Sequence, residues 1–331
     1  MNKIFKVIWS KSKQCYIVVS EIAKNKTGKK KIVVAGIFAA LAMVNGGQAT
    51  FAAWPAGGEG AQSAFWMGRS SSATGQNAQA IGVAANASSA KSVAIGSDSF
   101  AQGVPSGGEA NAATAVGAHS NATGPGASAF GFKAIANAGN ATAIGTDANV
   151  SGQYSVGVGW KSKVTVDNSI AIGEQAKALK EGSSVMGPDA RGYGNGSLSL
   201  GYQALAGANT YTGAVNNGAP FDDKAATINA YNKWGDAAIG LRAVATGGNA
   251  TALGRSASAT AANAIAIGGG NGDSAIDNTE KTEATGEKST AIGYNAKAKN
   301  TNDIAIGMTA NASDGNAIAI GRNVTSAGGA S

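Results

Sequence analysis

The 331-residue sequence contains little of what catalysis or metal binding usually requires. It has one cysteine, Cys15, and one histidine, His119, and aromatic residues make up only 6% of the chain. A lone histidine without a neighbouring group of Cys, His or acidic residues makes neither a metal site nor a catalytic triad. We therefore expect His119, just after Gly117, to be a surface turn residue, and we expect neither enzymatic activity nor a cofactor.

Low aromatic content combined with only 14% charged residues is also common in disordered chains. Disordered chains usually lack regularly spaced aliphatic residues, whereas this chain has them. Glycine contributes 49 residues, and alanine, serine and asparagine are abundant. We therefore predict a folded chain with a thin core that repeats.

An excess of positive charge is missing from most of the chain, although the formal net charge is +7. Residues 1–48 hold nine of the 26 Lys and Arg and one acidic residue, which leaves 17 basic against 18 acidic residues in the remainder. A nucleic-acid-binding protein would keep a basic patch in its folded part. The sequence therefore does not indicate a nucleic-acid partner.

The chain also lacks a hydrophobic run long enough to span a membrane. The apolar run Ile32–Val44 has 13 residues, which is short for a bilayer, and it follows the basic segment 1–31. This pattern is typical of a signal peptide with its apolar core at 32–44, and an uncleaved anchor is the less favoured alternative. The small residues that follow predict cleavage after Ala49 or Ala52. The mature chain, from about residue 53, would then contain no cysteine, which is compatible with export.

Glycines that follow a large apolar residue recur at a fixed interval. These repeat glycines are Gly68, Gly82, Gly96, Gly117, Gly131, Gly145, Gly159, Gly173, Gly187, Gly201, Gly240, Gly254, Gly268, Gly293, Gly307 and Gly321. Twelve of the fifteen intervals between them are 14 residues, and the other three are 21, 39 and 25. A fixed period sustained over most of a chain indicates a repeat architecture.

Around each repeat glycine the side chains alternate with period two, as in a β-strand. The residue before the glycine is large and apolar, and positions three and five after it are usually small, as in Ala176 and Ala178. Two short strands and two turns rich in Gly, Asn, Asp and Ser use up 14 residues, or one coil of a solenoid. The sequence therefore predicts an all-β, parallel β-roll, because the apolar stripe of an amphipathic helix is absent.

The alternation also predicts which side chains fill the roll. We expect the large apolar residues to form the repeat core: Ile81, Val93, Ile95, Val116, Ile144, Ile172, Leu200, Ile239, Leu253, Ile267, Ile292, Ile306 and Ile320. The residue two positions before each glycine would then face water, yet it is Ala, Gly or Ser in 14 of 16 units. Since β-propensity gives alanine no advantage there, we interpret this column as a subunit interface, with compositional drift as the alternative. The candidate interface residues are Ala94, Ala115, Ala143, Ala171, Ala252, Ala266, Ala291, Ala305 and Ala319.

The units SVAIG and AIAIG, at 14-residue spacing over about Ala64–Thr325, resemble the head repeats of the YadA-like trimeric autotransporter adhesins. In that family the repeats form a left-handed parallel β-roll, and three chains pack side by side. The resemblance thus implies a homotrimer that attaches to extracellular-matrix proteins, host cells or other bacteria. Many similar coils would let weak contacts add up through multivalency.

The first 25 residues carry a second resemblance. The stretch MNKIFKVIW, followed by the patch Tyr16–Val19 and then SEIAK, is similar to the extended signal peptide region of type V secreted proteins of Gram-negative bacteria. It implies export and display at the cell surface or outer membrane. We therefore expect residues 1–52 to be an extended signal peptide and residues 53–331 to be the head repeat domain.

The sequence departs from the family pattern at its C-terminus. Such adhesins normally continue into a neck, a heptad-patterned stalk and a membrane anchor, whereas this sequence ends at Ser331 directly after a head repeat. We expect membrane attachment only through an anchor that this chain does not contain. A structural spacer, or the head fragment of a truncated autotransporter, is therefore the alternative to an attachment function.

The three longer intervals predict insertions at 97–113, 208–235 and 269–288. The second insertion gathers the aromatic residues Tyr211, Phe221, Tyr231 and Trp234. Aromatic residues on an insertion suit a ligand-contact surface or local packing on the roll equally well. The third insertion is charged, so we expect a solvated loop.

Overall fold

The computed structural model describes residues 64–103, 112–207, 235–270 and 280–327, together with the backbone of short strands at 5–10, 15–20, 210–211 and 226–227. The chain divides into two units, Met1–Ala49 and Thr50–Ser331. In the first unit, β1 (Phe5–Ser10) and β2 (Cys15–Ser20) pair antiparallel. The described residues include no helix that is both long and apolar enough to cross a bilayer.

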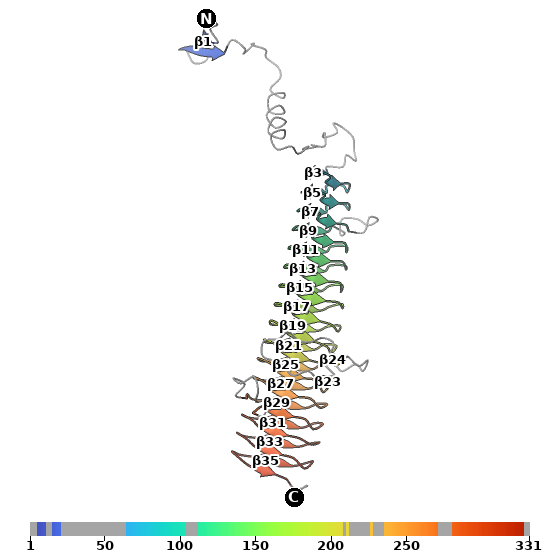
Figure 1. The fold of residues 1–331 in the computed structure, drawn as a ribbon, viewed down its shortest axis with the longest axis vertical. Coiled ribbons are helices and arrows are strands. Elements are labelled where there is room, and N and C mark those ends of the chain that lie inside the picture. Colours follow the sequence, from blue (N-terminus) through green and yellow to red (C-terminus); the bar gives the residue numbers. More distant parts are fainter. Residues whose placement is uncertain are drawn as a thin grey trace. The chain divides into compact units, whose positions relative to one another are not determined.

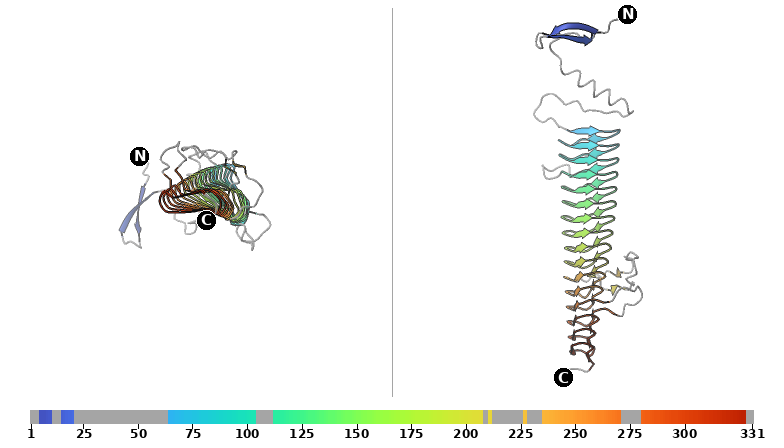
Figure 2. Two further views of the ribbon diagram at one scale, coloured as in Figure 1. Left: turned by 90° about the horizontal axis from the view of Figure 1, so that it is seen from below. Right: turned by 90° about the vertical axis from the view of Figure 1, so that its left-hand side faces the viewer.

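The second unit is a parallel β-solenoid built from two 16-stranded sheets (Figures 1 and 2). The long-strand sheet consists of β3 (Phe65–Met67), β5 (Gln79–Ile81), β7 (Val93–Ile95), β9 (Thr114–Val116), β11 (Ser128–Phe130), β13 (Thr142–Ile144), β15 (Val156–Val158), β17 (Ile170–Ile172), β19 (Ser184–Met186), β21 (Leu198–Leu200), β25 (Ala237–Ile239), β27 (Thr251–Leu253), β29 (Ile265–Ile267), β31 (Thr290–Ile292), β33 (Ile304–Ile306) and β35 (Ile318–Ile320).

The short-strand sheet consists of β4 (Ser72–Ala73), β6 (Asn86–Ala87), β8 (Phe100–Ala101), β10 (Asn121–Ala122), β12 (Ile135–Ala136), β14 (Asn149–Val150), β16 (Lys163–Val164), β18 (Lys177–Ala178), β20 (Arg191–Gly192), β22 (Leu205–Ala206), β26 (Val244–Ala245), β28 (Ser258–Ala259), β30 (Glu283–Ala284), β32 (Lys297–Ala298), β34 (Asn311–Ala312) and β36 (Thr325–Ser326). Each coil therefore contributes one strand to each sheet, which confirms the all-β solenoid predicted from the 14-residue period.

Strand pairing continues in register across the three longer intervals. Ile95 pairs with Val116, Leu200 with Ile239, and Ile267 with Ile292, so each insertion leaves the stack intact. The regular coil also takes up part of the first and third expected insertions, because β8 and β30 belong to the short-strand sheet. The second insertion contains β23 (Thr210–Tyr211) and β24 (Ala226–Thr227), which pair antiparallel with each other.

The repeat glycines are required where consecutive coils stack most closely. Gly131 has φ of +132°, a region that glycine tolerates and other residues rarely adopt. A Cβ atom built on it would lie 2.7 Å from the carbonyl carbon of Gly145 in the next coil. The constant glycine thus follows from a backbone contact that repeats from coil to coil.

The core of the roll consists of small side chains, which corrects the assignment made from the sequence. The alanine column that we interpreted as a subunit interface is fully buried inside the single chain: Ala94, Ala115, Ala143, Ala171, Ala252, Ala266, Ala291, Ala305 and Ala319. It packs with the alanines that lie three and five positions after the repeat glycines, such as Ala176 and Ala178. The large apolar residues therefore point outward, because the burial pattern of the long strands is buried at the middle residue alone.

The physical reason is the narrow gap between the two sheets. A Cβ atom on Gly157 would lie 2.6 Å from Cγ2 of Val150, and a Cβ atom on Gly192 would lie 2.8 Å from Cγ2 of Val185. Val150 and Val164 of the short-strand sheet thus lie against Gly157, and Val185 of the long-strand sheet lies against Gly192. Isoleucine at every long strand could not fit such an interior, since protein cores are already close-packed.

Candidate functional site: the outer surfaces of the roll

The large apolar residues form what we call the apolar face, on the outside of the long-strand sheet. It comprises the third residue of each long strand and the first residue where that residue is apolar, including every residue expected to form the repeat core: Ile81, Val93, Ile95, Val116, Ile144, Ile172, Leu200, Ile239, Leu253, Ile267, Ile292, Ile306 and Ile320. All are exposed or half-buried in the single chain, with Ile144 and Leu200 both 41% exposed. In-register pairing aligns them into continuous columns.

A contiguous apolar surface of this extent is uncommon on a monomeric soluble protein, and such surfaces usually mark contacts with another molecule. The third residue of the long strand is apolar in all sixteen coils, from Met67 to Ile320. The face therefore has the chemistry that the sequence led us to expect of a core, but it lies on the outside of the roll.

The opposite outer surface, on the short-strand sheet, is mostly polar, and we call it the polar face. Its first strand position includes Asn86, Asn121, Asn149, Lys163, Lys177, Glu283, Lys297 and Asn311. Glu283 accepts ion pairs from Lys281 at 3.1 Å and from Lys297 at 3.9 Å. The roll thus presents apolar side chains on one side and amides, hydroxyls and charges on the other.

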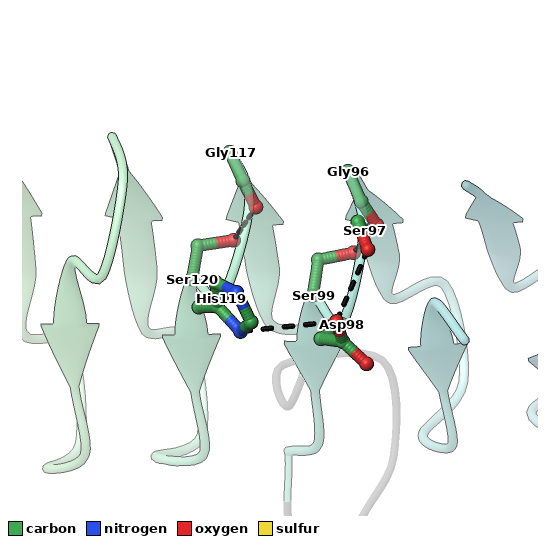
Figure 3. Close-up of polar contacts among 7 residues, drawn as sticks. All are labelled: Gly96, Ser97, Asp98, Ser99, Gly117, His119 and Ser120. Atoms are coloured by element: carbon green, nitrogen blue, oxygen red, sulfur yellow. Dashed lines mark hydrogen bonds and ion pairs between the residues drawn. The ribbon is translucent and has the colours of Figure 1, made fainter. Parts of the chain in front are cut away.

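In most coils the residue two positions after the repeat glycine lies in the left-handed region. His119 and Asp98 occupy this position in consecutive coils, with φ of 55° and 53°. Their side chains are both 52% exposed, and Nδ1 of His119 lies 3.8 Å from Oδ2 of Asp98 (Figure 3). Beside them, the hydroxyls of Ser99 and Ser120 donate to the carbonyls of Gly96 and Gly117 (Figure 3). His119 therefore lies in a surface turn, and serine supports the turn from inside.

Some polar side chains are buried in the roll, and sequence reasoning missed their role. The Asp303 carboxylate accepts the backbone N–H groups of Asn300 at 2.8 Å and of Ala317 at 3.0 Å. In an interior column that is otherwise Ser or Ala, apart from Asp236, it ties one coil to the next. Asp236 does the same, because its carboxylate accepts the backbone N–H of Ala250 at 2.8 Å. An aspartate in a column of Ser and Ala is visible in the sequence, and it could have indicated this role.

Two further pairs of ionisable side chains lie on the roll, one exposed and one buried. The hydroxyl of Tyr294 donates to the carboxylate of Glu280 at 2.5 Å, and this hydrogen bond raises the pKa of the phenol. The guanidinium of Arg191, which is buried, lies 3.2 Å from Oδ1 of Asp189. Within the described ranges there is no group of three or more His, Cys, Asp or Glu side chains that could hold a metal ion.

The aromatic residues proposed from the sequence as ligand contacts belong to the second insertion. Phe221, Tyr231 and Trp234 lie outside the described residues, and for Tyr211 the structure describes the backbone of β23 alone. Their role as ligand contacts therefore stays a prediction.

Comparison with protein families matches both parts of the chain. The Extended Signal Peptide of Type V secretion system matches residues 1–49. The YadA head domain repeat matches just over half of the chain, at residues 73–99, 109–134, 136–162, 167–190, 245–271, 284–310 and 299–323. The chain belongs to the YadA-like trimeric autotransporter adhesins.

This membership explains the export signal and the repeats together. A YadA-like adhesin is exported by the type V route and displayed on the surface of Gram-negative bacteria. The YadA head family consists of homotrimeric adhesins that bind host molecules and are generally non-enzymatic. Comparison with curated proteins found no match to this chain.

Proposed function

We propose that this YadA-like chain is the head of a homotrimeric surface adhesin, in which the apolar face forms the interface between three copies. One observation carries the proposal: an apolar side chain faces outward from the long-strand sheet in every coil. Burying such a face removes apolar area from water at roughly 25 cal/mol per Å². A core of alanines buries little apolar area per coil, so the single roll gains little free energy from its core. Association of three rolls would supply further stability.

We infer the number of three subunits and the left-handed winding of the roll from the resemblance to the family. The burial pattern supports the choice of interface, because it leaves the polar face and the turns free to meet ligands. We propose that these surfaces, together with the second insertion, attach to extracellular-matrix proteins, host cells or other bacteria, without catalysis. Repetition over many coils and three chains would raise the strength of weak contacts.

The domain organisation follows from the same proposal. Residues 1–52 act as the extended signal peptide, with the basic leader at 1–31 and the apolar core at 32–44, and residues 53–331 act as the head. Residues Tyr211, Phe221, Tyr231 and Trp234 are proposed ligand contacts on the second insertion.

The solution mass of the exported chain tests the proposal directly. Light scattering after size exclusion should give the mass of three chains. A folded monomer would contradict the assignment of the apolar face to a subunit interface. A trimer that fails to retain matrix proteins, host cells or bacteria on a coated surface would leave a structural spacer as the function.

A further inference from the structure

One edge of the roll carries a row of side chains that lies outside the apolar face. We call it the turn ridge, and it consists of the first and second residues after the repeat glycines of four consecutive coils. These are Ala118 and His119, Phe132 and Lys133, Thr146 and Asp147, and Trp160 and Lys161. The ridge connects the apolar face to the polar face, because it lies between a long strand and the short strand that follows it.

Backbone hydrogen bonds hold these turns in register from coil to coil. The N–H of Asp147 donates to the carbonyl of Phe132 at 2.9 Å, and the N–H of Lys161 donates to the carbonyl of Thr146 at 2.9 Å. Lys133, Asp147 and Lys161 all have φ between 53° and 55°. The ridge is therefore a rigid ladder whose side chains repeat at the coil spacing, which is ~4.8 Å for neighbouring strands.

Two aromatic residues on this ladder are exposed, and each is paired with the lysine that follows it. Phe132 is 45% exposed and Trp160 is 43% exposed. The ammonium of Lys133 lies 5.1 Å from the centre of the Phe132 ring, and that of Lys161 lies 4.3 Å from the Trp160 ring. Each pair thus places an exposed aromatic ring beside a positive charge.

The coil between the two pairs has the opposite character. Thr146 and Asp147 stand where the neighbouring coils carry an aromatic residue and a lysine. In the described part of the chain, neither Lys133 nor Lys161 forms an ion pair with Asp147, since both ammonium groups lie over the rings. Along the ridge, a coil with an aromatic ring and a lysine is thus followed by a coil with a hydroxyl and a carboxylate, and then by a second coil with an aromatic ring and a lysine. The two aromatic–lysine pairs are ~10 Å apart.

This alternation matches one class of polymer. In an extended β-linked polysaccharide each sugar advances the chain by about one coil spacing, and every second sugar presents the same face. Aromatic rings pack against the C–H face of a sugar, and an ammonium group binds a carboxylate by a charge-assisted hydrogen bond. Asp147 would repel a carboxylate on the sugar in between, so it discriminates against a chain that is charged at every sugar.

We propose that the turn ridge binds an acidic polysaccharide that carries a carboxylate on every second sugar. The sugars bearing the carboxylates lie against Phe132–Lys133 and Trp160–Lys161, and the neutral sugar between them lies beside Thr146 and Asp147. His119 packs edge-on against Phe132 with ring centres 5.7 Å apart, and it steadies the first aromatic position. The proposal rests on the adhesin function above and names a ligand class for it.

The test uses the full exported chain and three polysaccharides that differ in charge pattern. Hyaluronan oligosaccharides have a carboxylate on alternate sugars, alginate oligosaccharides have one on every sugar, and dextran has none. Titration calorimetry at low salt should show hyaluronan bound more tightly than alginate, and dextran not bound. Equal binding of hyaluronan and dextran, or no hyaluronan binding, would overturn the proposal.

Variants then assign the binding to the ridge. Trp160→Ala and Lys161→Gln should each weaken hyaluronan binding about fivefold or more, as expected for loss of one surface contact per chain. Matched controls on the other turn of the coil are Tyr154→Ala and Lys288→Gln, both at exposed positions with similar φ, and they should bind as wild type. Ridge variants that bind hyaluronan as tightly as the controls would reject the assignment.

Asp147→Asn provides the test of discrimination. It should raise the affinity for alginate while changing that for hyaluronan little, because the charge that opposes the intermediate carboxylate is gone. The solution mass of Trp160→Ala separates a ligand role from a subunit contact: a trimer supports the proposal, and a monomer overturns it. A wild-type chain that retains host cells or bacteria but ignores hyaluronan would reject the ligand class and leave the adhesin function standing.

Discussion

Val185 and Gly192 lie opposite each other across the core of one coil, and the side chain of Val185 fills the space between their backbones. A Cβ atom on Gly192 would approach Cγ2 of Val185 to 2.8 Å and the Cβ of Ser183 to 3.1 Å. In most other coils both positions are alanine, and where Val150 occupies the second position the next long strand carries Gly157. The spacing of the two sheets therefore limits the combined volume of these two side chains.

Gly192→Ala is expected to destabilise the roll by about 1–3 kcal/mol, because it overpacks this part of the core. The double variant Val185→Ala/Gly192→Ala should recover most of the loss, since it reproduces the alanine pair of the preceding coil. The shift of the urea unfolding midpoint measures both effects. A double variant that is no more stable than the single one would show that the two positions do not share a space.

Gly131→Ala should cost more, about 2 kcal/mol or more, because it combines an unfavourable φ with a collision against the next coil. Gly139→Ala is the matched control in the following turn. There an added Cβ atom would meet Cγ of Pro125 at 3.6 Å, which is an ordinary contact. Thermal unfolding of the two variants should differ clearly, and equal stability would contradict the account of the repeat glycines.

Ile144→Asp combined with Leu253→Asp is expected to convert the three-chain species into monomers or aggregates. Both side chains point outward on the apolar face, so a charge there would be buried without a partner on association. Asn149→Asp changes the polar face of the same coil as Ile144 and should leave the solution mass unchanged. Light scattering checks both, and a trimer formed by the double variant would place the interface elsewhere.

Asp303→Ala is expected to lower stability by about 1–3 kcal/mol, because the buried N–H of Ala317 and the partly buried N–H of Asn300 lose their acceptor. Ser289→Ala is a control in the same interior column one coil earlier. In the described part of the chain the Ser289 hydroxyl has no hydrogen-bond partner, so its removal should cost little. Equal losses in urea unfolding would mean that the carboxylate does not connect the coils.

Tyr294 should ionise at higher pH than an ordinary tyrosine, whose pKa is 10.0, because its hydroxyl donates to the Glu280 carboxylate. A pKa raised in the folded state gives a stabilising contribution that is complete below pH 10 and is lost as the pH rises through the folded value. Ultraviolet difference titration should show one tyrosine that ionises at a higher pH than an ordinary tyrosine. Glu280→Gln should lower the pKa of this tyrosine towards 10.0. A titration unchanged by that substitution would show that the contact is absent in solution.

The period and alternation of the sequence were sufficient to predict the solenoid, its 14-residue coil and the two strands in each coil. Local geometry alone accounts for this success, since a repeat glycine ends each long strand and period-two patterning defines a strand. The placement of side chains was predicted in part. Ile144 and Ala143 were correctly assigned to opposite sides of one strand, but the inner and outer sides were exchanged.

The sequence by itself determined that the chain repeats, that each coil has one large apolar and one small column, and that the export signal belongs to the type V class. The tertiary structure decided which column is inside. Hydrophobicity favours burial of isoleucine over alanine, yet the sheets of a 14-residue coil lie so close that Gly157 has to face Val150. The geometry of closing so short a coil overrides the preference of single side chains, and the large residues are left for another surface to cover.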